Sequence, residues 1–124
     1  MSKLGHFEIL KERAVFRPTG QVSIEQAVEL VTAAIAFARS LHIRKLLVDA
    51  SNLTGFESPD VNMRYLFIHE WARAAAGGVR VALVTRPEMI DSRKFGVIVA
   101  ANRGFTADAF TTEEDELIWL ERVK

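Results

Sequence analysis

The sequence predicts a single α/β domain over residues 1–124, built on a mixed β-sheet of about five strands and four helices in the order β-β-α-β-α-β-α-β-α. Two observations lead to this fold class. Short apolar runs bounded by turn residues alternate with longer segments whose apolar residues recur at helical spacing. The chain also opens with two short strands joined by a tight turn. Alternating strands and helices favour a parallel sheet, and the opening hairpin makes it mixed.

The first half of the chain contains the predicted hairpin, a helix and a buried strand. Phe7–Leu10 and residues 13–17 form the hairpin. Ser23 is the expected N-cap of the helix, and Gln26 three residues later completes a capping box. The apolar face of this helix comprises Ile24, Ala27, Val28, Val31, Ala34, Ile35 and Ala38. Residues 45–48 are apolar on both faces, which is typical of a strand inside a sheet.

The second half continues the alternation. Its expected elements are a helix at 59–76, a strand at 79–84, a helix at about 87–102 and a strand at Ala107–Phe110. The pair Gly77-Gly78 ends the first of these helices. Thr111 or Thr112 caps a final helix, whose acidic first turn suits a helix N-terminus.

The composition argues against several classes of function. Sixteen basic residues balance sixteen acidic ones and are interspersed with them, so nucleic acid is not an expected partner. There is no cysteine, which excludes disulfides and thiolate chemistry. The three histidines lie in different elements without metal-ligand spacing, so no metal or other cofactor is expected. No apolar run approaches the roughly 20 residues that span a bilayer, and a cytoplasmic protein is expected.

Two loops at one edge of the predicted sheet form the candidate site. Ligands of parallel sheets bind beyond the carboxyl ends of the strands, so loops 49–58 and 85–94 should be neighbours. Ser58 precedes Pro59 at the expected start of the second helix, where unpaired N–H groups attract anions. Ser58 is therefore a candidate phosphorylation or anion site, although the pattern favours a plain N-cap. The cations expected beside it are Arg86, Arg93 and Lys94.

Asp49, at the end of the buried strand, has two interpretations. It could be a buried acid with a shifted pKa. The favoured alternative is structural, with its carboxylate accepting hydrogen bonds from the backbone of residues 51–53.

The second helix carries more apolar surface than one packing face requires. Its expected core face comprises Val61, Tyr65, Ile68, Ala72 and Ala75. A second stripe, rotated by roughly 120°, comprises Met63, Phe67, Trp71 and Ala74. Either a neighbouring helix covers this stripe, or it forms a dimer surface, a partner groove or the wall of an apolar pocket. The candidate ligand or partner surface is Met63, Arg64, Phe67, Trp71 and Arg86.

The chain resembles the SpoIIAA-like family of STAS domains in three features. These are the order of its elements, the Leu-Leu-Val-Asp sequence at residues 46–49 before the loop, and residues 110–120, which begin with Phe, continue with an acidic run and end in Trp-Leu. That family is grouped by fold with CRAL-TRIO lipid-transfer domains. In the anti-sigma factor antagonists of the STAS family, a partner kinase phosphorylates a serine or threonine that follows an aspartate. The resemblance matches Ser58 to that position and Glu57 to the aspartate, and the chain departs from the pattern at Pro59 and Asp60.

The topology, the second apolar stripe and the absence of a catalytic motif predict a stand-alone, non-enzymatic STAS-like regulatory domain that acts by docking to a protein or by homodimerisation. The alternative is a carrier or sensor of a small amphipathic or lipid-like ligand beside the second helix. An enzyme using Asp49 or His69 as a base would need both side chains in one cleft. No triad or phosphate-binding glycine loop is present in the sequence.

Overall fold

The structure is a computed structural model that describes residues 7–10, 13–57, 60–87, 101 and 104–122. Its principal strands are β1 (Phe7–Leu10), β2 (Arg13–Phe16), β4 (Lys45–Asp49), β6 (Arg80–Val84) and β7 (Ala107–Phe110). The helices in the described part are α1 (Ile24–Ser40), α2 (Val61–Ala75) and α4 (Glu113–Arg122). The predicted helix at 87–102 lies almost entirely outside the described residues.

The five strands form one mixed sheet in the order β1-β2-β4-β6-β7. Only the first pair is antiparallel, with Phe7 opposite Phe16. The other pairs are parallel, and Lys45 lies opposite Arg80 where β4 meets β6. The predicted mixed α/β fold is confirmed, because the sheet combines one antiparallel pair with three parallel pairs.

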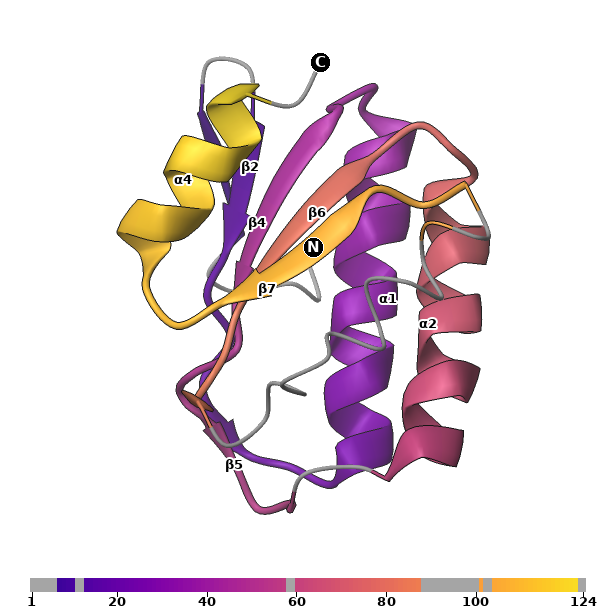
Figure 1. Cartoon of the computed structure of the whole chain (residues 1–124), viewed down its shortest axis with the longest axis vertical. Coiled ribbons are helices and arrows are strands. Elements are labelled where there is room, and N and C mark those ends of the chain that lie inside the picture. The colour runs from indigo at the N-terminus through magenta and orange to yellow at the C-terminus, as the bar shows by residue number, and fades with distance from the viewer. Residues whose placement is uncertain (1–6, 11–12, 58–59, 88–100, 102–103, 123–124) are drawn as a thin grey trace.

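The helices cover the two faces of the sheet unequally (Figure 1). On one face α1 and α2 lie side by side, and the main core there includes Phe16, Ile35 and Leu46. On the other face α4 lies alone over a smaller cluster that includes Leu47 and Leu120. Successive residues of β4 therefore alternate between the two cores, as the pleat of a strand requires.

Helix α1 begins as the sequence predicts. The Ser23 hydroxyl accepts a hydrogen bond from the Gln26 backbone N–H at 3.1 Å, and the Gln26 side chain accepts one from the Ser23 N–H at 2.9 Å. This reciprocal pair satisfies two of the N–H groups that a helix start leaves without partners. The capping box is therefore confirmed.

Helix α2 begins two residues later than the sequence suggested. Its N-cap is Asp60, whose Oδ1 accepts a hydrogen bond from the Met63 N–H at 2.8 Å. The prediction of Ser58 as the cap and Pro59 as the first helical residue is therefore wrong, because the carboxylate of Asp60 fills that role. At the other end Ala76 adopts a left-handed conformation (φ 47°) before Gly77, so the helix ends where the glycine pair indicated.

A second, two-stranded sheet is a feature that the sequence did not reveal. Here β3 (Gly20–Gln21) pairs in parallel with β5 (Leu53–Thr54). Gly55 follows directly with φ 103°, and a Cβ there would come within 2.6 Å of the Val22 carbonyl oxygen. Only glycine allows this close approach, which ties the loop after β4 to the start of α1. Within the described ranges, no helix is long and apolar enough to cross a membrane.

Candidate functional site

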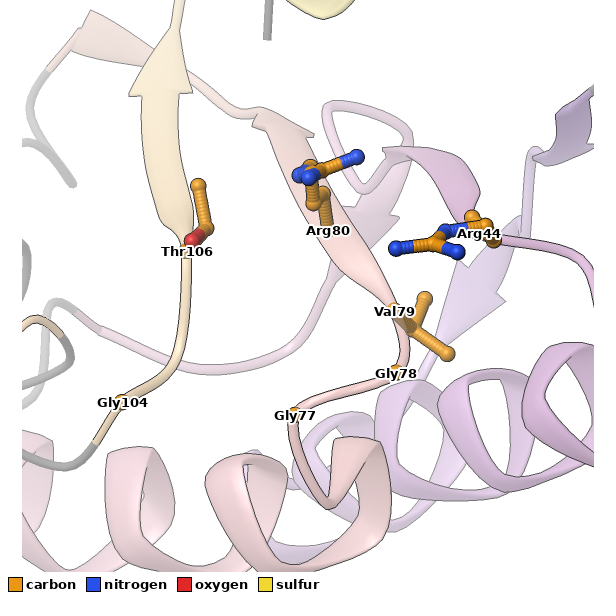
Figure 2. A pocket seen from close by; sticks show the side chains of 7 residues that line it. All are labelled: Arg44, Gly77, Gly78, Val79, Arg80, Gly104 and Thr106. Carbon is orange, nitrogen blue, oxygen red and sulfur yellow. The ribbon is translucent and has the colours of Figure 1, made fainter. Parts of the chain in front are cut away.

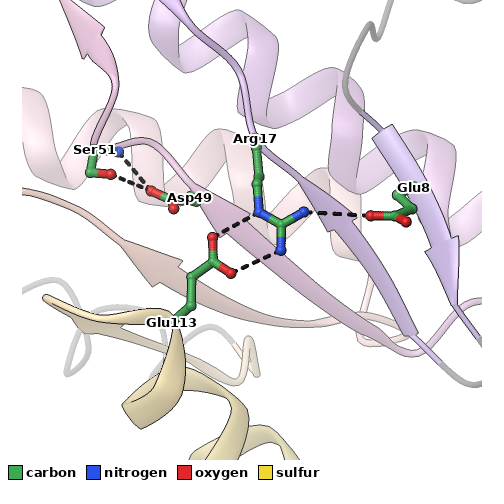
Figure 3. A network of polar contacts seen from close by, with 5 residues as sticks. All are labelled: Glu8, Arg17, Asp49, Ser51 and Glu113. Carbon is green, nitrogen blue, oxygen red and sulfur yellow. Dashed lines mark hydrogen bonds and ion pairs between the residues drawn. The ribbon is translucent and has the colours of Figure 1, made fainter.

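A network of charged side chains lies at the carboxyl ends of the parallel strands (Figure 3). Arg17 follows β2 and Glu113 begins α4. The Arg17 guanidinium donates from Nε to Glu113 Oε2 at 2.8 Å and from Nη2 to Oε1 at 2.9 Å. It also donates to Glu8 Oε1 at 3.4 Å. This bidentate contact fixes the start of α4 against the central sheet, because both partners are charged and the two guanidinium N–H groups align with the two carboxylate oxygens.

Asp49 is held by the loop that follows β4. Its Oδ1 accepts hydrogen bonds from the Ser51 N–H at 3.0 Å and from the Ser51 hydroxyl. The predicted bond to the following backbone is thereby confirmed. Burial raises the pKa of Asp49, and a hydrogen bond with Glu113 raises it further. The pKa shift expected under the other interpretation is therefore present as well.

Glu113 is the more acidic member of the carboxyl pair. The Arg17 hydrogen bonds, followed by the one from Asp49, lower the pKa of Glu113 to about 2. The pKa of Asp49 moves in the opposite direction, so Asp49 takes up a proton before Glu113 does as the pH falls.

Glu116 lies one turn further along α4 and is completely buried. Neither carboxyl oxygen has a hydrogen-bond partner. Burial, followed by the negative charges of Asp49 and Glu113, raises the pKa of Glu116 to about 10. The carboxyl group is therefore protonated at neutral pH, because an ionised carboxylate without a partner is unstable in an apolar core.

The sequence indicated the acidic start of α4 but not this network. From the sequence alone, Glu113 is a negative charge that favours a helix N-terminus, and nothing distinguishes Glu116 from its acidic neighbours. The available signal was spacing, because Glu116 lies four residues before Leu120 and thus on the same helix face. The pairing of Arg17 with Glu113 spans 96 residues and had no local signal.

The two loops that the sequence placed together do meet. The Arg86 guanidinium carbon lies 6.0 Å from the centre of the Phe56 ring, in cation–π geometry. This contact joins the loop after β6 to the loop before α2. Ser58, Arg93 and Lys94 lie outside the described residues, and the role of Ser58 as a phosphorylation or anion site stays a prediction.

Trp71 turns inward to the main core. It is 7% exposed, and its indole N–H donates to the Val28 carbonyl oxygen of α1 at 3.3 Å. The Phe67 ring stacks on it with centroids 4.8 Å apart. Of the alternatives for this stripe, coverage by a neighbouring helix is thus the one observed at Trp71. Any role of Met63, Arg64, Phe67 or Arg86 in binding stays a prediction.

The expected core face of α2 needs one correction. Ile68 and Ala75 are buried as predicted, but Tyr65 is 40% exposed. The Tyr65 ring instead packs edge-on against His69, with centroids 4.5 Å apart. Its neighbour Leu66 is 64% exposed.

Asp49 and His69 do not share a cleft. Asp49 interacts with α4, whereas His69 lies on α2 at the other face of the sheet. A mechanism that uses both as one acid–base pair is excluded by this separation. In the described part of the chain, no group of histidine and carboxylate side chains is arranged to hold a metal ion.

Comparison with known proteins finds likeness in structure only. No family model matches the chain. No curated protein matches it. Among solved structures, the NMR structure of the protein TM1081 has a TM-score of 0.52 at 13% identity, covering 99% of this chain and 92% of that one. The unphosphorylated form of the anti-sigma factor antagonist SpoIIAA has a TM-score of 0.49 at 22% identity, covering 94% and 97%.

These identities are low, so the likeness concerns the fold and not the activity. At that level the predicted mixed α/β fold is confirmed. The function has to be argued from the surface and the site of this chain.

Proposed function

We propose that this chain is a regulatory domain that acts by binding a protein partner and not by catalysing a reaction. The observation that carries the proposal is the outer surface of α2. Leu66 is 64% exposed and Tyr65 is 40% exposed, although the same helix buries Ile68 and Trp71 fully enough to anchor it. Large apolar side chains that cluster on an anchored helix are typical of a docking surface.

The partner that this surface fits is a second copy of the chain. Leu66, Glu70 and Arg73 lie at positions i, i+4 and i+7 and so form one stripe. Glu70 and Arg73 are 56% and 81% exposed and lie 3.6 Å apart. Two such stripes packed antiparallel place Glu70 of each copy beside Arg73 of the other. This reciprocal charge pairing adds specificity to the apolar contact of Leu66.

Control of this binding by phosphorylation at Ser58 is the finer part of the proposal. It is supported by the resemblance at residues 56–60 and by the position of Ser58, two residues before the cap of α2. A phosphate there would add negative charge near the docking helix.

The carrier hypothesis has less support. Phe67 and Trp71 stack on each other and pack against the main core. These two members of the stripe therefore contact the chain's own core. Among the described side chains of α2, none favours this function over protein binding.

Sedimentation equilibrium of purified variants tests the proposal. Leu66→Gln is expected to weaken dimerisation at least tenfold, because it removes the most exposed apolar side chain of the proposed interface. Ile118→Gln is the matched control: Ile118 is 50% exposed on α4, at the other face. Its dimerisation constant should not change.

A charge exchange tests the antiparallel geometry separately. Arg73→Glu places like charges opposite each other and should weaken dimerisation, whereas the double variant Glu70→Arg with Arg73→Glu should restore it. A wild-type chain that remains monomeric at millimolar concentration would rule out a second copy as the partner. Equal effects of Leu66→Gln and Ile118→Gln would rule out α2 as the surface.

A further inference from the structure

A small polar pocket lies at the amino ends of the parallel strands, at the opposite edge of the sheet from the Arg17–Glu113 network (Figure 2). Its volume is about 70 Å³, which is room for several water-sized atoms. Seven residues line it: Arg44, Gly77, Gly78, Val79, Arg80, Gly104 and Thr106. They come from three segments, which lie at the starts of β4, β6 and β7.

The backbone holds two arginines at this pocket. The Arg80 N–H donates to the Arg44 carbonyl oxygen at 2.7 Å, so the residues lie on adjacent strands at neighbouring positions. Lys45 lies directly opposite Arg80 in the register of β4 and β6. Figure 2 shows the Arg44 guanidinium extending toward β6, where Arg80 begins the strand. The backbone thus places three cationic residues close together at one edge of the sheet.

None of these three cations has a counter-ion in the described part of the chain. Among the described residues, no carboxylate lies within 4.0 Å of Arg44, Lys45 or Arg80. By contrast, Arg17 and Arg73 each have a carboxylate partner. Like charges on adjacent strands destabilise a sheet, so an anion bound between them would be stabilising.

The remaining walls leave the cations accessible. At Gly77 and Gly104 an added Cβ would meet no atom within 4 Å, so open space surrounds both backbone segments. The Gly78 and Gly104 N–H groups already donate to the Ala75 and Ala101 carbonyl oxygens. Ligand donors therefore have to come from side chains, namely the two guanidinium groups and the Thr106 hydroxyl.

We propose that this pocket binds a phosphate group through Arg44 and Arg80, with Lys45 adding charge. A guanidinium group offers paired N–H donors that match two oxygens of a phosphate, and two such groups can hold a tetrahedral dianion from two sides. The pocket admits the phosphate itself, and the rest of a phosphorylated molecule would extend into solvent. The site is independent of the docking surface on α2.

Titration of the isotope-labelled protein with inorganic phosphate, followed by amide NMR at constant ionic strength, tests the proposal. Phosphate is expected to shift the Gly77, Gly78 and Gly104 amide signals in a saturable manner that chloride does not reproduce. Arg44→Gln and Arg80→Gln should each raise the dissociation constant at least tenfold. Arg122→Gln removes one exposed cation at the end of α4 and should leave the constant within twofold.

Amide spectra of each variant check that the fold is retained. The proposal is overturned if chloride moves the same signals as far as phosphate does, or if Arg122→Gln weakens binding as much as Arg80→Gln. Two further probes separate the sources of the phosphate group. Tighter binding of O-phosphoserine than of phosphate indicates a soluble phosphorylated molecule. Co-sedimentation with vesicles of phosphatidylcholine and phosphatidic acid, lost in Arg44→Gln, indicates a lipid headgroup.

Discussion

Glu116 is the side chain whose protonation matters most for stability. Its pKa in the folded chain is about 10, whereas the ordinary value is 4.5. Between about pH 4.5 and pH 10, the folded state therefore holds a proton that the unfolded state has already released. Over that interval the stability from this group decreases as the pH rises, by up to about 1.4 kcal/mol per pH unit.

Glu116→Gln should flatten this decline, since glutamine has nearly the same shape and does not ionise. The measurement is the free energy of unfolding in urea at several pH values for both proteins. Glu116→Leu should in addition stabilise the chain at neutral pH by about 1–3 kcal/mol, because it removes two buried oxygens without partners. Parallel pH curves for wild type and Glu116→Gln would contradict the assignment.

Arg17 is expected to control the protonation of Glu113. Its two hydrogen bonds are the largest cause of the low Glu113 pKa, so Arg17→Gln should raise that pKa toward 4.5. The stability that Glu113 contributes is present above its ordinary pKa and is lost as the pH falls toward 2. In the variant this pH-dependent loss should be smaller, because the folded and unfolded pKa values of Glu113 lie closer together. Carboxyl-carbon NMR titration of Glu113 measures the shift directly.

The energetic effect of Arg17→Gln at neutral pH should be modest. The Arg17 side chain is 44% exposed, so solvent screens the pair and about 1 kcal/mol is expected. Arg13→Gln is the control, because it breaks a single contact between Arg13 and Glu121 at 3.2 Å. A Glu113 pKa that does not respond to Arg17→Gln would show that Asp49 alone sets it.

At the scale of elements, the start of α2 offers a direct comparison of two candidate caps. Asp60→Ala removes the acceptor of the Met63 N–H and should cost about 1 kcal/mol of stability. Ser58→Ala should change stability by less than about 0.5 kcal/mol, since Asp60 already fills the cap. Thermal or urea unfolding of both variants measures the difference. A larger loss for Ser58→Ala would restore the serine as the cap.

Elements with local signals could be predicted from the sequence. The capping box at Ser23, the glycine pair after α2 and the apolar runs of β4 and β6 each depend on neighbouring residues, and each appears where expected. The start of α2 was misplaced because Ser58, Pro59 and Asp60 all favour a helix N-terminus. Local propensity alone does not choose among such adjacent candidates.

Features that depend on distant residues could not be predicted in this way. The inward position of Trp71 on α2 depends on its hydrogen bond to Val28 of α1, 43 residues earlier. The pairing of β3 with β5 joins segments too short to show a strand pattern. Ligands of parallel sheets bind beyond the carboxyl ends of the strands, and this rule predicted both the place of Asp49 in the candidate site and the contact between the two loops. The contact of Arg17 with Glu113 could be found only in the three-dimensional fold.

At the scale of the whole molecule, the two faces of the sheet differ in the number of apolar side chains buried on them. The α1–α2 face buries the larger core of the described residues. The cluster under α4 is smaller: its buried members are Val15, Leu47, Ala82 and Leu120, and Phe110, Leu117 and Trp119 are partly buried against them. A layer with fewer buried apolar contacts opens at lower free energy. The α4 layer also contains Glu116, whose burial becomes less favourable as the pH rises. Helix α4 should therefore separate from the sheet before α1 does.

Native-state hydrogen exchange, read by amide NMR or mass spectrometry, measures this order. After correction for the intrinsic exchange rate, the opening free energy of α4 amides should lie below that of α1 amides at pH 6 and should fall further at pH 9. The α1 amides should change little over the same interval. In Glu116→Gln the difference between the two pH values should disappear for α4, because no buried carboxyl remains to ionise. Equal opening energies for α1 and α4 at both pH values would mean that the two faces unfold as one cooperative unit.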